Sequence, residues 1–287
     1  MDNMIENRDL RTPLKVYCDP SSNIQSQEHV KPFHYYSAIR LVLEGGLEPE
    51  AILPRPPFTS EKKTQEKYVL KYSPEVANTS EATVLGGLRS KQIDLTVRSA
   101  ETGPALGISF KTTSNAFRNI PNRVEELLGD VTNIHLRYPA FTYGFCHVVK
   151  MVRESDAPKP NDASFTDDGN PITSIKQFHD LLTQLTGRRR VSDRPELYES
   201  VSLLVVECNS KGARIFPDYP PKNSPVHFDR FFERLYQVYD ERYCYVGADR
   251  SFCRKSWTLS NDKQTQSVKL ESALFGYSPR LWNGNTE

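Results

Sequence analysis

The pattern of apolar and polar positions predicts a chain in which helices and strands alternate. Apolar residues at helical spacing, together with helix-end signals, predict helices at residues 33–43, 60–72, 120–138, 175–185 and 228–243. Near-continuous apolar runs predict strands at residues 140–152 and 201–208. A strand–helix–strand succession of this kind suits a parallel crossover, so we expect an α/β fold with a mixed central sheet flanked by helices. The pattern shows no domain boundary, and residues 1–287 are predicted to form one domain.

Two further segments, residues 91–98 and 107–113, alternate with the period of two that is typical of strands. A Gly-Pro turn signal lies between them, which favours an antiparallel hairpin. The symmetry of such a hairpin sets Asp94 across from Ser109 and Lys111. We therefore expect these three polar side chains to share one face of the sheet.

The helix predicted at residues 120–138 adds a carboxylate. At 100° per residue, Glu125 flanks the apolar stripe and can reach back toward the hairpin, whereas Glu126 points away from it. Two carboxylates beside a lysine suit metal-assisted phosphodiester cleavage, because hard oxygen ligands hold Mg²⁺ and the lysine positions the attacking water. Asp94, Glu125 and Lys111 are therefore the candidate catalytic group.

This constellation resembles the PD-(D/E)xK nuclease superfamily over roughly residues 91–152. More narrowly, it is similar to type II restriction endonucleases in which Ser or Thr replaces the first acid of the tripeptide and a helix glutamate supplies the missing carboxylate. The tripeptide from Ser109 to Lys111 and the spacing to Glu125 fit that subgroup. The resemblance implies a restriction endonuclease-like core, with Asp94 and Glu125 as Mg²⁺ ligands, Lys111 as the catalytic lysine and Ser109 at the vacated acid position.

The function implied is a Mg²⁺-dependent endonuclease that hydrolyses double-stranded DNA at a specific sequence. By analogy we expect a homodimer in the cytoplasm, a cognate DNA methyltransferase in the same system, and a catalytic core at residues 91–153 followed by a part for DNA recognition or dimerisation. Two alternatives stay open, a repair or junction-cleaving nuclease and a non-cleaving DNA-binding protein with the same core. A third interpretation is purely structural, with Asp94 and Lys111 as an ordinary cross-strand ion pair and Glu125 solvated.

Two groups of residues are candidates for DNA contact, because their side chains can bind phosphates or a guanine edge. One group follows the strand predicted at residues 107–113, and the other is a basic turn further along the chain. The candidates are Ser114, Asn115, Arg118, Asn119 and Arg123, and Arg188, Arg189 and Arg190. The same residues also have explanations that involve no function. The first group can form a helix cap with exposed side chains, and the second can form a solvated charged loop.

The composition of the chain argues against several classes of protein and of binding site. A formal net charge of +1 removes the argument for a general polycation, so a surface for nucleic acid must be local. The five cysteines form no CxxC pair and a chain of this length needs no disulfide, which favours a reducing intracellular setting and argues against structural zinc. No apolar run approaches the roughly 18–20 residues of a membrane span. The histidines show no metal-ligand spacing. No GxxxxGK(S/T) or GxGxxG nucleotide-binding motif accompanies a strand-to-helix turn, and the GxSxG motif of serine hydrolases is absent from the sequence.

Overall fold

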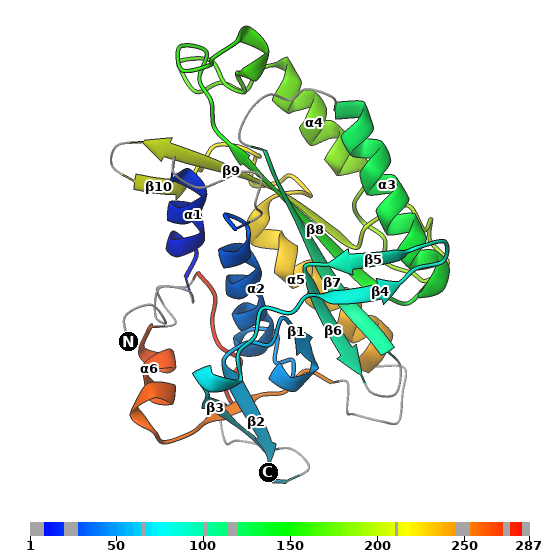
Figure 1. Ribbon diagram of the computed structural model, residues 1–287, viewed down its shortest axis with the longest axis vertical. Coiled ribbons are helices and arrows are strands. Elements are labelled where there is room, and N and C mark those ends of the chain that lie inside the picture. Colours follow the sequence, from blue (N-terminus) through cyan, green and yellow to red (C-terminus); the bar gives the residue numbers. More distant parts are fainter. Residues whose placement is uncertain are drawn as a thin grey trace.

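The computed structural model describes residues 9–19, 28–64, 67–99, 103–113, 120–209, 212–244, 253–271 and 276–282 (Figure 1). The helices are α1 (Arg11–Cys18), α2 (Lys31–Leu43), α3 (Ile120–Arg137), α4 (Thr173–Gln184), α5 (Phe231–Tyr239) and α6 (Lys263–Glu271). The strands are β1 (Ile52–Leu53), β2 (Phe58–Lys62), β3 (Tyr68–Tyr72), β4 (Ala82–Leu85), β5 (Ser90–Ile93), β6 (Leu95–Ser99), β7 (Gly103–Thr113), β8 (Thr142–Lys150), β9 (Ser200–Asn209), β10 (Gly212–Ile215) and β11 (Trp257–Leu259).

A mixed sheet of six strands forms the centre of the molecule, in the order β1-β6-β7-β8-β9-β10. β1, β6 and β7 are antiparallel neighbours, and β8 and β9 then continue parallel to β7. α3 connects β7 to β8, which is the predicted parallel crossover. The expected α/β fold with a mixed central sheet is therefore confirmed.

Helices cover both faces of this sheet (Figure 1). α2 and α5 pack on one face, in a hydrophobic cluster with Ile108 of β7 and Cys146 of β8. α3 and α4 pack on the other face, in a cluster with Tyr143 and Phe145. Successive β8 side chains thus point into opposite cores, because strand side chains alternate between faces. This burial on both sides explains why β8 reads as a continuous apolar run.

The strand predicted at residues 91–98 is broken at Asp94. β5 leaves the central sheet, pairs with β4 and packs near α3, whereas β6 pairs with β7. In that pairing Leu95 lies opposite Ile108, so the register carried one residue further sets Asp94 opposite Ser109. The predicted antiparallel hairpin is confirmed, and β7 extends five residues beyond Ile108, the last residue paired with β6.

The prediction of a helix at residues 60–72 is wrong. This stretch forms β2 and β3, which pair antiparallel, and β3 also pairs in parallel with β11. Leu70 and Tyr72 are buried, while Glu61 and Lys62 are exposed near the turn between the strands. The helix-like charge pattern belongs to that exposed turn, and pairing with the distant β11 completes the small sheet.

A disulfide joins Cys18 at the end of α1 to Cys208 of β9. The argument from chain length against disulfides is therefore wrong for this pair. Cys146, Cys244 and Cys253 are free thiols.

Breaking this disulfide is expected to lower the free energy of unfolding by about 4–5 kcal/mol, because it closes a loop of 190 residues in the unfolded chain. The Cys208→Ser variant should therefore melt well below the wild-type protein in thermal unfolding followed by circular dichroism. Cys253→Ser, which removes a free thiol, is the control and should melt near the wild type. An equal melting temperature for Cys208→Ser and wild type would contradict the linkage.

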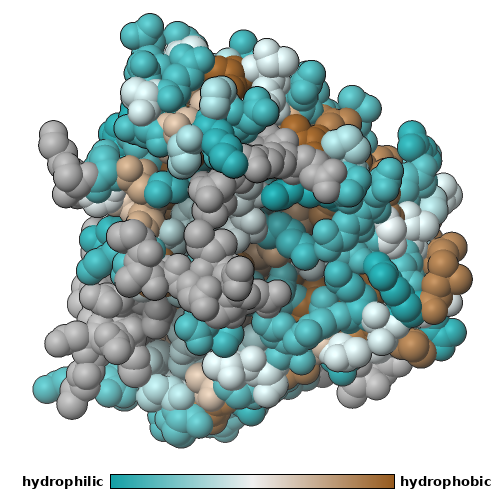
Figure 2. All heavy atoms as spheres, turned by 45° about the horizontal axis from the view of Figure 1, so that its top comes forward, coloured by the Kyte–Doolittle hydropathy of each residue, from teal (hydrophilic) through white to brown (hydrophobic). Residues whose placement is uncertain are grey.

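Within the residues described, no helix combines the length and apolar character needed to cross a membrane. The face drawn in Figure 2 is mainly hydrophilic, and apolar residues occur there in small separate areas. The large apolar side chains that are exposed in the described chain are Leu85, Leu88, Leu136, Val191 and Trp282.

Candidate functional site

A cavity of about 280 Å³ opens beside Asp94, at the break between β5 and β6. α2 forms one wall, and β7 and α3 form others. Its polar lining residues are His29, His34, Glu81, Lys91, Gln92, Asp94, Ser109, Lys111, Thr112, Asp130, Tyr143 and Tyr198. Three of the four predicted catalytic residues therefore border one cavity.

The Asp94 carboxylate is oriented by the backbone of β7. Its Oδ2 accepts a hydrogen bond of 2.6 Å from the amide of Phe110, while its Oδ1 lies 3.8 Å from His34 Nε2. Burial raises the pKa of the Asp94 carboxyl, and the His34 ring and the Phe110 hydrogen bond oppose this rise without cancelling it. The arrangement disfavours an isolated negative charge on Asp94 and makes a cation beside it stabilising.

His34 and Glu81 complete a cluster that sequence reasoning missed. His34 Nδ1 lies 3.5 Å from Glu81 Oε1, and Glu81 Oε2 accepts a hydrogen bond from Gln92. The hydrogen bond with His34 lowers the pKa of the Glu81 carboxyl. One potential ligand atom from each of His34, Glu81 and Asp94 lies within 4.8 Å of the other two, which is a spacing compatible with one metal ion. No sequence motif predicts this cluster, because its members come from three separate segments of the chain.

Lys111 pairs with Glu126, not with Glu125. The distance from Lys111 Nζ to Glu126 Oε1 is 3.0 Å; burial acts to raise the pKa of Glu126, but this ion pair outweighs it and lowers the pKa. The expectation that Glu126 points away from the hairpin is therefore wrong. The helix is rotated from the predicted phase because the polar residues Asp130 and Asn133 are buried beneath β4 and β5. Glu125 is exposed and is not among the residues that line the cavity.

Ser109 is the residue that we expected at the vacated acid position. Its hydroxyl lies 2.9 Å from the hydroxyl of Tyr143, and the side chain is buried. Burial raises the pKa of Tyr143, so this partner is a neutral phenol. The pair brings no negative charge to the cavity, and any second anionic ligand must come from another segment.

Four of the predicted DNA-contacting residues, Ser114, Asn115, Arg118 and Asn119, lie outside the described residues. Arg123 is partly buried, and its guanidinium donates to Thr113 Oγ1 at 2.5 Å. Arg123 is on α3, and Thr113 at the end of β7 follows Thr112 of the cavity lining. Arg123 itself is not among the residues that line the cavity.

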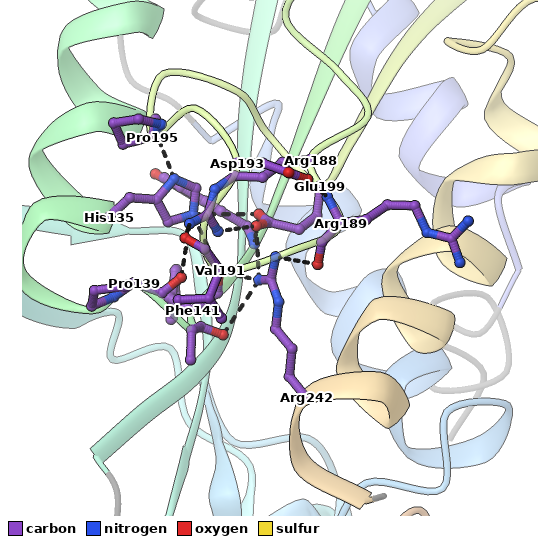
Figure 3. Close-up of polar contacts among 12 residues, drawn as sticks. His135, Pro139, Phe141, Arg188, Arg189, Val191, Asp193, Pro195, Glu199 and Arg242 are labelled. Carbon is purple, nitrogen blue, oxygen red and sulfur yellow. Dashed lines mark hydrogen bonds and ion pairs between the residues drawn. The ribbon is translucent and has the colours of Figure 1, made fainter. Parts of the chain in front are cut away.

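The prediction that Arg188 contacts DNA does not fit the structure. Its side chain is 1% exposed and pairs with Glu199 at 2.7 Å, because it holds a buried network together (Figure 3). Arg189 points out of that network and pairs with Glu241, and Arg190 is exposed. Neither Arg189 nor Arg190 is among the residues that line the cavity beside Asp94.

Comparisons with known proteins found no match for this chain. The chain matches no family model, no curated protein and no solved structure.

Proposed function

We propose that this protein is a metal-dependent nuclease that hydrolyses phosphodiester bonds of double-stranded DNA at a specific sequence. The observation that carries the proposal is the convergence of Asp94 and Lys111 on one cavity at the β6–β7 hairpin. A homodimer and a companion methyltransferase remain predictions of this interpretation.

The surrounding topology supports a PD-(D/E)xK-type core. The hairpin that bears Asp94 and Lys111 is followed by α3 and then by β8, which is parallel to β7. The resemblance seen in the sequence requires this succession of hairpin, helix and parallel strand. The order of elements and the placement of the acid and the lysine thus agree with each other.

The ligand chemistry at Asp94 suits a divalent cation. The carboxylate oxygens of Asp94 are hard ligands of the kind that Mg²⁺ prefers, and the nearby Glu81 carboxylate adds a second negative charge against the two positive charges of the ion. When bound, such an ion would polarise the scissile phosphate and lower the pKa of a nearby water. Glu81 thereby supplies the negative charge that Ser109 lacks.

Lys111 is available to act on the substrate. Its side chain is 44% exposed and that of Glu126 is 50% exposed, so their ion pair is a weak surface interaction of about 0–1 kcal/mol. The ammonium group can leave Glu126 at little cost and donate to a phosphate oxygen or to the attacking water. We assign this positioning and charge-stabilising role to Lys111.

The decisive test is incubation of the purified protein with linear duplex DNA, with Mg²⁺ or Mn²⁺ and with EDTA, read on a gel. We expect discrete fragments with either metal and none in EDTA. Lys111→Ala should lower the cleavage rate about 100-fold or more, because the developing charge loses its donor. Lys159→Ala, on the loop after β8, is the matched control and should cleave normally.

Other outcomes separate the alternatives. Preferential cutting of branched or damaged DNA would indicate a repair or junction-cleaving nuclease. DNA binding without metal-dependent scission, together with no effect of Lys111→Ala, would overturn the nuclease proposal in favour of a binding protein.

A further inference from the structure

The ring of His34 faces Asp94 with an unused nitrogen. We infer that His34 Nε2 is a direct metal ligand beside Asp94, and that the site for this reason binds Mn²⁺ in preference to Mg²⁺. The inference deepens the proposed nuclease function and rests on it for the purpose of the metal site. The metal binding itself can be measured without DNA.

The first observation is that His34 is buried with one ring nitrogen left without a partner. The residue is 4% exposed, and its Nε2 atom has no hydrogen-bond partner among the described residues. The Asp94 Oδ1 atom that it faces is 3.8 Å away, which is too far for a hydrogen bond. A buried polar atom without a partner is destabilising. A cation between the two atoms resolves this, because ligands about 2.1 Å from a shared ion lie roughly 3–4 Å apart.

Neighbouring groups orient both ligand atoms toward each other. Glu81 Oε1 faces His34 Nδ1 at 3.5 Å and favours the proton on Nδ1, which leaves the Nε2 lone pair directed at Asp94. The amide of Phe110 holds Asp94 Oδ2, which leaves Oδ1 available. A carboxylate behind a histidine is the usual second partner of a metal-bound imidazole, since it fixes the ring and raises its basicity. Glu81 is therefore the positioning residue for His34.

The mixed ligand set determines the metal preference. Mg²⁺ favours oxygen ligands and keeps its waters, whereas imidazole nitrogen favours transition metals. Mn²⁺ accepts carboxylates and imidazole together. A site made of the Asp94 carboxylate and the His34 imidazole should therefore bind Mn²⁺ at least about tenfold more tightly than Mg²⁺.

The test uses Mn²⁺ alone as the probe on the full-length protein. Titration followed by electron paramagnetic resonance gives the Mn²⁺ affinity, and competition gives that of Mg²⁺. In wild-type protein labelled with ¹⁵N-histidine, pulsed spectra of bound Mn²⁺ should show a ¹⁵N coupling. This measurement needs no substitution, so it remains decisive even if a variant at buried His34 does not fold.

Variants then assign the nitrogen. His34→Gln should remove the coupling and weaken Mn²⁺ binding at least about tenfold, whereas His179→Ala, on α4 and not among the residues that line the cavity, should keep both. Glu81→Gln should keep the coupling but weaken binding.

Bound Mn²⁺ without nitrogen coupling, or Mg²⁺ bound as tightly as Mn²⁺, would overturn the inference. If the coupling is present but DNA is not cleaved, the metal site stands and the nuclease proposal fails. If DNA is cleaved but the coupling is absent, the nuclease proposal stands and His34 is not a ligand.

Discussion

Replacing Asp94 by asparagine is expected to abolish metal-dependent DNA cleavage, with a fall in rate of at least about 1,000-fold. The amide keeps the size of the side chain and can still accept the hydrogen bond from Phe110. It removes the negative charge that attracts the cation and the free carboxylate oxygen that faces His34. Initial rates of duplex cleavage in excess Mn²⁺ or Mg²⁺ measure the effect.

The control for this variant is Asp167→Asn, the same change on an exposed loop residue bonded to Ser155. It should cleave at the wild-type rate. DNA binding in Ca²⁺, which occupies oxygen sites but supports hydrolysis poorly, should be retained by both variants. An Asp94→Asn protein with more than about a tenth of wild-type activity would show that Asp94 does not hold the catalytic ion.

Replacing Glu199 by alanine is expected to lower the free energy of unfolding by about 3–5 kcal/mol. Glu199 is fully buried, and its Oε1 lies 2.7 Å from the guanidinium groups of both Arg188 and Arg242 (Figure 3). Its Oε2 accepts the amide of Tyr143 and lies 3.4 Å from His135 Nε2. Alanine would leave two buried guanidinium groups without their carboxylate, and that uncompensated charge is strongly destabilising. Urea unfolding measures the difference.

The same network links α3, the loop before β9 and the π-helical residues Asp240–Cys244 that follow α5. His135 donates from Nδ1 to the carbonyl of Pro195, and Arg242 donates to that of Phe141. As a control, Glu196→Ala removes a carboxylate three residues away whose pair with Arg194 is at the surface, and it should change stability by less than about 0.5 kcal/mol. Equal stabilities for the two variants would contradict a structural role for Glu199.

The contribution of Glu199 should depend on pH. Burial acts to raise the pKa of this carboxyl, but the hydrogen bond and charge of His135 and the charge of Arg242 outweigh it and lower the pKa overall. The unfolded chain, in which a glutamate titrates near 4.3, therefore binds the proton more readily. The stability difference between wild type and Glu199→Gln should be full above about pH 5 and shrink as the pH falls through the lowered pKa. A difference that grows on acidification would contradict this sign.

Local periodicity predicted the elements that carry the proposed chemistry. The alternation around Asp94 and Ser109 and the turn between their strands determine the hairpin and its register, because both depend on neighbours in sequence. The spacing of apolar residues in α3 likewise determined the helix, but its rotation could not be predicted. Burial of Asp130 and Asn133 decides that rotation, and with it the choice of Glu126 over Glu125 as the partner of Lys111.

The sequence by itself determined that this is an α/β chain with an acid and a lysine brought to the same part of a hairpin. Tertiary structure alone decided the rest of the site. His34 and Glu81 meet Asp94 only after α2 packs on the sheet, and Arg188 is withdrawn from solvent by Glu199. The physical reason is that periodicity reports which face of an element is apolar, whereas the partner of a charged side chain is set by segments far away in the chain.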